Sequence, residues 1–306
     1  MPNPRPLSLI AAPTNLGLRP PEPTAVPGTA KAPEALRAAG LWDRMADIAD
    51  DGGLIPCPRY RDDKAPGSGR LRNHDALLDY SDRLAHRLTE TLDRNQAPLI
   101  IGGDCSILLG VGQALSQRGR YGLVHLDGHT DFRHPGNSDA CAALAGEDLA
   151  AAIGLHWPEV SLHGGRQHVQ PSDVVHLGCR PDDVFRTEVE THLPLVMTSP
   201  ELRNDTTSAA ERARAIVDRP DLDGYWIHFD VDVLDPLVMP AVDSPSPGGL
   251  FLGDLLHLLE ILAPGATGAH ITIYDPDLDP TGAYATLLVD LIATAFHPLG
   301  STSDQC

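Results

Sequence analysis

The chain alternates short, almost wholly apolar segments with segments of helical period along nearly its whole length. Most of the apolar segments end at an Asp, a Gly or a Pro. Because strands that are apolar throughout are buried on both faces, this alternation predicts a mainly parallel sheet covered by helices on either side. No repeat and no linker rich in Pro, Gly or Ser divides the chain. We therefore expect a single α/β domain over residues 1–306, folded as a three-layer α/β/α sandwich.

The expected strands share an apolar character and a length of a few residues: Leu7–Ala11, Gly53–Ile55, Pro98–Ile101, Gly122–Leu126, Val174–Leu177, Leu193–Met197, Tyr225–Phe229 and Gly268–Tyr274. The expected helices share a helical spacing of leucines and alanines: Leu77–Leu92, Ser106–Gln117, Gly146–Ile153, Ser208–Asp218, Gly253–Leu262 and Tyr284–Phe296. Ser208 with Glu211 three residues later matches a capping box, so we expect Ser208 to begin its helix.

The charge balance limits the partners that this chain can bind. With 23 Lys and Arg against 42 Asp and Glu, the formal net charge is −19 at pH 7. So acidic a chain is repelled by phosphate backbones and anionic lipids, and we expect neither nucleic-acid nor membrane binding. Cationic small molecules and metal ions are its natural partners. No apolar run approaches the roughly 20 residues of a membrane span, and the N-terminus does not resemble a signal peptide.

The five cysteines are odd in number and scattered, and no CxxC pair occurs. This pattern indicates neither a disulfide framework nor a zinc ribbon. We expect free thiols and a cytoplasmic location.

Polar clusters follow three of the predicted strands, where ligands bind in parallel α/β sheets. The clusters are Gly102–Ser106 (GGDCS), Asp127–Asp131 (DGHTD) and Asp230–Pro236 (DVDVLDP). Residues i, i+2 and i+4 of an extended chain share a face, so the carboxylates within each cluster point the same way. Converging carboxylates repel one another, and bound divalent cations relieve that repulsion. Several carboxylates with one imidazole suit Mn²⁺. A single DxD motif is usually a turn, but two such motifs, each at the end of an apolar strand, indicate metal binding more specifically.

These motifs stand in the order and spacing of the arginase/agmatinase/formimidoylglutamase family, the ureohydrolases, whose usual forms are GGDHS, DAHxD and DxDxxDP. Segment Gly28–Leu41 also resembles that family's opening loop and first helix. The resemblance implies an α/β/α sandwich and a pair of Mn²⁺ ions per chain. It implies hydrolysis of a linear, non-peptide C–N bond in a guanidino or amidino small molecule by a hydroxide that bridges the metals. It also implies a homo-oligomer, either a trimer or a hexamer.

The resemblance also implies a ligand set, position by position. One ion would be held by Asp127, His129, Asp230 and Asp232, and the other by Cys105, Asp127, Asp131 and Asp230. Asp131 would in addition orient the hydroxide, which makes it the expected catalytic residue.

Cys105 stands where the family usually has His. A thiolate is softer than an imidazole and adds a negative charge, so Zn²⁺, Fe²⁺ or Ni²⁺ could replace Mn²⁺. The alternative is that Cys105 is a packing residue and that the metal site is incomplete. The chain would then be a non-catalytic or regulatory homologue.

Two further departures concern substrate and proton transfer. Ala145 stands where arginases carry a proton-shuttle His, and Glu147 or Asp148 could take over part of its role. Ile273 stands where a Glu grips the guanidinium, so arginine is not the expected substrate. We expect Asp148 and Asp275 to contribute carboxylates to substrate binding.

Overall fold

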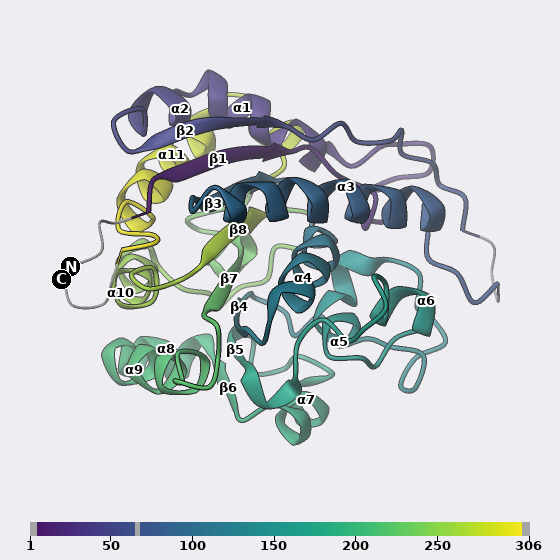
Figure 1. Ribbon diagram of the computed structural model, residues 1–306. Helices are drawn as coiled ribbons and strands as arrows, with labels where there is room; N and C mark the ends of the chain where they lie inside the picture. The colour runs from purple at the N-terminus through teal and green to yellow at the C-terminus, as the bar shows by residue number, and fades with distance from the viewer. Residues whose placement is uncertain (1–4, 65–67, 302–306) are drawn as a thin grey trace.

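The computed structural model describes residues 5–64 and 68–301, so Cys306 lies outside the described residues. These residues form three layers, with helices on both faces of one sheet (Figure 1). The sheet contains eight strands in the order β2-β1-β3-β8-β7-β4-β5-β6, and every neighbouring pair is parallel. The three-layer α/β/α sandwich predicted from the alternating pattern is confirmed.

The strands are β1 Leu7–Ala12, β2 Ala49–Leu54, β3 Ala97–Gly102, β4 Gly122–Leu126, β5 Val174–Cys179, β6 Leu195–Thr198, β7 Tyr225–Asp230 and β8 Gly268–Thr272. Strand β2 begins earlier than expected because it lies at the sheet edge with partly exposed side chains, and so lacks an apolar run. Strand β8 ends before Ile273, which has a positive φ of 74°.

The longer helices are α1 Ala32–Ala38, α3 His74–Asp93, α4 Ile107–Arg118, α5 Asp148–Ala152, α7 Arg186–His192, α8 Ser199–Asn204, α9 Thr206–Val217, α10 Leu252–Leu262 and α11 Ala283–Ala295. The shortest are α2 Leu41–Arg44 and α6 Pro158–Ser161. The expectation that Ser208 caps α9 is wrong. Asp205 caps it instead, because its carboxylate accepts the backbone N–H of Ser208 at 3.0 Å and satisfies that donor from outside the helix.

Alternate side chains of each central strand enter two separate cores, as the period of a strand requires. In β1, Leu7 and Leu9 belong to the core that includes residues of α1, α9, α10 and α11, whereas Ile10 belongs to the core that includes residues of α3, α4 and α5. No helix in the described part of the chain is long and apolar enough to cross a membrane.

The register of the central strands places the polar clusters together. Leu126 at the end of β4 lies opposite Phe229 of β7, and Asp230 lies opposite Thr272 of β8. The next residue after β4 is Asp127, so it leaves the sheet beside Asp230. Strand β3 lies next to β8, which brings the Gly102–Ser106 turn to the same edge.

Candidate metal centre

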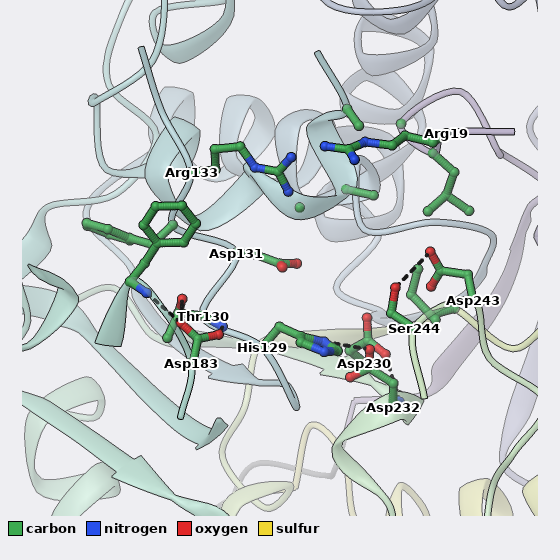
Figure 2. A pocket seen from close by; sticks show the side chains of 18 of the residues that line it. Arg19, His129, Thr130, Asp131, Arg133, Asp183, Asp230, Asp232, Asp243 and Ser244 are labelled. Carbon is green, nitrogen blue, oxygen red and sulfur yellow. Dashed lines mark hydrogen bonds and ion pairs between the residues drawn. The ribbon is translucent and has the colours of Figure 1, made fainter. Parts of the chain in front are cut away.

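The motif residues converge at this edge of the sheet around a cavity of about 300 Å³. His129, Asp131, Asp230 and Asp232 line it (Figure 2). Asp127 lies beneath them and is fully buried. The two DxD-type motifs thus form one acidic site at the carboxyl ends of adjacent strands.

The two loops that carry these residues are cross-linked by short hydrogen bonds. Asp127 Oδ1 accepts the backbone N–H of His129 at 2.6 Å, and Asp230 Oδ1 accepts that of Asp232 at 2.8 Å. Between the loops, His129 Nδ1 lies 2.9 Å from Asp232 Oδ2, and Asp232 Oδ1 accepts the N–H of Gly128 at 3.1 Å. The side chains are therefore held in place by the protein itself.

The carboxylates of the site resist ionisation together. Burial raises the pKa values of Asp127, Asp131 and Asp230, and the neighbouring carboxylates raise them further. Asp232 differs: although burial opposes its ionisation, His129 and Arg180 hold its pKa below the usual range. Asp232 in turn raises the pKa of His129 to about 10. A divalent cation would stabilise the ionised forms that burial disfavours.

Cys105 reaches the centre of this site. Its side chain is fully buried, and its thiol donates to Asp230 Oδ2 at 2.9 Å. Burial raises the pKa of the thiol, and the nearby carboxylates, Asp230 foremost, raise it further, so Cys105 carries its proton in this arrangement. Ligation of a metal by Cys105 stays a prediction, but its sulfur lies within 4.8 Å of ligand oxygens of Asp127 and Asp230.

The donor atoms fit a divalent cation. One candidate ligand group comprises Cys105, Asp127, His228 and Asp230, whose ligand atoms all lie within 4.8 Å of one another. Asp127 Oδ2 is buried and has no hydrogen-bond partner among the described residues. Unpartnered buried oxygens are costly, and a metal ion is a usual reason for keeping them.

The two expected substrate carboxylates do not reach the cavity. Asp275 instead accepts the backbone N–H groups of Gly28 at 3.1 Å and Asp277 at 2.9 Å, because its Asp-Pro sequence forms a turn. Asp148 is buried at the start of α5, behind the cavity wall. Neither carboxylate lines this cavity, so their role in substrate binding stays a prediction.

The positions of the two missing family residues do line the cavity, as Ala145 and Ile273. Ile273 has a φ of 74° and Asp131 a φ of 44°. Left-handed backbone is strained for a β-branched residue, and such strain tends to collect at functional sites. Glu147 cannot replace the missing His, because its carboxylate is fixed by His156 at 2.9 Å and by backbone N–H groups.

Two arginines were not foreseen from the sequence. The guanidinium groups of Arg19 and Arg133 lie across the cavity from Asp230 and Asp232 (Figure 2). Neither makes a hydrogen bond or an ion pair with another described side chain. The only sequence signal was the position of Arg133, two residues after the DGHTD motif.

A row of histidines was also missed as a unit. His270, His228, His125 and His176 lie opposite one another on the adjacent strands β8, β7, β4 and β5, and all four are fully buried. The rings of His125 and His228 stack with centroids 4.4 Å apart. The one signal in the sequence is a His two residues before the first Asp of each DxD-type motif.

Comparison with known proteins decides the family. The family model described as "Arginase family" matches residues 6–297, nearly the whole chain. The chain belongs to the arginase family. It is 28% identical to the arginase of Bacillus caldovelox over 301 residues, which cover 95% of this chain and 98% of that protein.

Solved structures of the arginase family have the same fold. The native B. caldovelox arginase superposes with a TM-score of 0.84 at 28% identity and covers 95% of this chain and 98% of its own. The formimidoylglutamase of Bacillus subtilis shares the fold with a TM-score of 0.77 at 18% identity, covering 98% of this chain and 88% of that one. The resemblance read from the three motifs is therefore confirmed, and the chain is an arginase-family ureohydrolase.

Proposed function

We propose that this chain is a metal-dependent hydrolase of a linear C–N bond in a guanidino or amidino small molecule other than arginine. The observation that carries the proposal is the convergence of Asp127, Asp131, Asp230 and Asp232 with His129 around one cavity. Buried carboxylates in this number call for divalent cations, which when bound lower the pKa of water toward neutrality and so make a nucleophile available.

The positions of the residues suit different ones to metal binding and to proton transfer. Asp127, His129, Asp230 and Asp232 would hold one ion, and Cys105, Asp127, Asp131 and Asp230 the other. Asp131 lies in the cavity wall, so its carboxylate would take a proton from the attacking water and return it to the leaving amine. Its backbone is fixed by the neighbouring Thr130, whose N–H and hydroxyl both donate to Asp183, at 3.0 and 2.7 Å.

The two arginines favour a substrate that carries an anionic group at the end opposite its guanidino or amidino group. Arg19 and Arg133 face the same cavity, and burial and the charge of Arg133 together lower the pKa of Arg19. Two unpaired guanidinium groups in a chain of net charge −19 are best explained by an anion that they bind. A carboxylate suits them, with the amidine group at the opposite, acidic side of the cavity.

Arginine fits this cavity poorly. Ile273 lies where a Glu would pair with the guanidinium, and Ala145 where a His would transfer protons. The curated relatives above are arginases, so our proposal differs from them in substrate while keeping their reaction type.

A panel assay tests the proposal. The full chain, loaded in parallel with Mn²⁺, Zn²⁺, Fe²⁺ or Ni²⁺, is incubated with guanidino and amidino compounds whose far end is a carboxylate, a neutral group or an amine. We expect release of urea or ammonia from carboxylate-ended compounds other than arginine. Arg133→Leu should lower kcat/KM for these by about 10- to 100-fold at unchanged metal content. Turnover of arginine at an ordinary enzymatic rate contradicts the substrate assignment.

The second candidate is a non-catalytic homologue, which the protonated, hydrogen-bonded thiol of Cys105 favours. Metal content separates the two. A chain that retains almost no metal after dialysis against Mn²⁺ or Zn²⁺, and hydrolyses none of the panel, is the non-catalytic homologue.

A further inference from the structure

Behind the cavity lies a set of buried polar atoms that the proposed mechanism leaves unused. Asp148, at the start of α5, has both carboxylate oxygens buried without a hydrogen-bond partner among the described residues. The same is true of Nε2 of His125 on β4 and of Nε2 of His228 on β7. Leaving so many polar atoms unsatisfied in a protein interior is strongly unfavourable unless something else binds them.

These atoms surround the position expected for the metal held by Cys105. The ligand atoms of Cys105, Asp131 and Asp148 lie within 4.8 Å of one another, and so do those of His125, Asp148 and His228. Asp148 belongs to both groups. It therefore joins the expected ligands on the cavity side to the histidines of the sheet.

The separations fit ligands of one ion better than hydrogen bonds. His125 Nε2 lies 3.5 Å from Asp148 Oδ1 and 3.9 Å from Asp127 Oδ2. Good N–H···O hydrogen bonds are shorter, about 2.7–3.2 Å. Neighbouring ligands that each lie about 2.1 Å from a metal are about 3.0 Å apart in an octahedral site and about 3.4 Å apart in a tetrahedral site. The observed spacing requires little movement to accept a cation.

The hydrogen-bond chain decides which histidine can be a ligand. Trp226 Nε1 can only donate, and it donates to His270 Nδ1 at 2.8 Å. Neutral His270 then carries its proton on Nε2 and donates it to His228 Nδ1. His228 must therefore carry its own proton on Nε2, which leaves no lone pair there for a metal.

His125 has no such restriction. Its Nδ1 lies 3.0 Å from Nδ1 of His176 and can donate to it, which leaves the lone pair of His125 Nε2 directed toward Asp148. A ligating His usually donates its other ring N–H to a fixed acceptor in this way.

We propose that Asp148 and His125 are ligands of the inner metal ion and replace the imidazole that position 105 lacks. This inference rests on the proposed function only in requiring that a divalent cation binds at this centre. His228 is then a positioning residue, whose Nε2–H faces Asp127 Oδ2 at 3.5 Å.

Metal titration combined with thermal unfolding tests the proposal. The full chain is stripped with a chelator and titrated with Mn²⁺ and with Zn²⁺, and stoichiometry, Kd and Tm are measured for wild type, Asp148→Asn and His125→Gln. We expect two ions in wild type. In each variant one ion should remain and the other should bind at least about 100-fold more weakly. The metal-free Asp148→Asn protein should be as stable as wild type or more stable, because a buried, unpartnered carboxylate is removed.

Asp279→Asn is the matched control. Asp279 is also buried, but its Oδ2 accepts the hydroxyl of Tyr274 at 2.8 Å and the N–H of Ala285 at 2.9 Å, and only its Oδ1 lacks a partner among the described residues. This variant should lose stability without metal and keep both ions. If Asp148→Asn behaves like the control, Asp148 is structural and the inference is overturned.

The two proposals fail separately. If wild type binds two ions, both variants lose one, and no compound in the panel is hydrolysed, the ligand assignment holds and the proposed function fails. If wild type is an active two-metal enzyme and both variants keep two ions at unchanged Kd, the ligand assignment fails and the function holds.

Discussion

The thiol of Cys105 lies 2.9 Å from Oδ2 of Asp230 and donates a hydrogen bond to it. The same sulfur lies 3.2 Å from the hydroxyl of Thr272, on the strand next to that of Asp230. To bind a metal ion, the Cys105 thiol must lose that proton. Burial opposes this loss, because it raises the pKa of the thiol. A metal ion bound at this position would therefore have to displace a proton that a neutral imidazole would not need to release.

Replacing Cys105 by His should strengthen the binding of Mn²⁺. An imidazole binds as a neutral ligand and suits Mn²⁺ better than a thiolate does, so we expect the weaker of the two Kd values to fall at least about tenfold. Equilibrium dialysis with metal analysis measures this. Cys179→Ser, which changes a buried thiol outside the candidate ligand groups, should leave both Kd values unchanged. An unchanged Kd for Cys105→His would indicate a packing role for the cysteine.

Asp230→Asn should remove most bound metal, because Asp230 is expected to bridge both ions. The measurement is metal content per chain after dialysis, with a fall from about two ions to fewer than one expected. Asp235→Asn is the control from the same motif, since Asp235 accepts backbone N–H groups of Leu237 at 3.0 Å and Gly248 at 2.7 Å. Equal metal content in the two variants would show that the motif has been misassigned.

Above about pH 6.5, where the buried histidines with lowered pKa values are neutral in both states, the metal-free protein should lose stability as pH rises. The folded-state pKa of His129 is raised to about 10, so its pairing with Asp232 contributes fully below about pH 6.5 and is lost as pH rises through 10. The raised pKa values of Asp127, Asp131 and Asp230 act in the same direction, because the folded state binds more protons than the unfolded state.

Thermal unfolding between pH 7 and pH 9.5 with chelator measures this dependence. Saturating Mn²⁺ should weaken or reverse it, since the ion stabilises the ionised carboxylates. His129→Gln should remove the part of the decline above about pH 6.5. A metal-free protein whose Tm rises steadily over the whole range would contradict the assigned shifts.

Trp226→Phe should weaken metal binding from a distance. The variant keeps an aromatic ring in the core but removes the donor that fixes His270 and, through it, His228. We expect about a tenfold rise in Kd, as for other residues that orient a metal ligand. Nitrogen-15 NMR should find the His228 proton on Nε2 in wild type and a mixture of tautomers in the variant. Trp157→Phe, outside the histidine row, should change neither measurement.

Much of the fold followed from local patterns. Wholly apolar strands such as Gly122–Leu126 are recognisable because burial on both faces leaves no polar position. The edge strand β2 was placed poorly because exposed positions do not constrain residue type. The convergence of the expected ligands could be predicted. Asp127, His129 and Asp131 lie close together in sequence, and the strand before them must end at the same edge of the sheet as its parallel neighbours.

The sequence alone therefore determined the layers, the sheet edge and the expected ligands, since each depends on residues a few positions apart. The tertiary structure decided which residues from other parts of the chain lie opposite these expected ligands. The pairing of His125 with His228 depends on which strands are neighbours and in what register, and no local pattern encodes either. Arg19 reaches the cavity from a distant loop, and Asp148 lies behind it rather than within it, because α5 packs its first turn against the sheet. Contacts between segments far apart in the chain arise only when the sheet is assembled, which is why the acidic centre could be predicted and its surroundings could not.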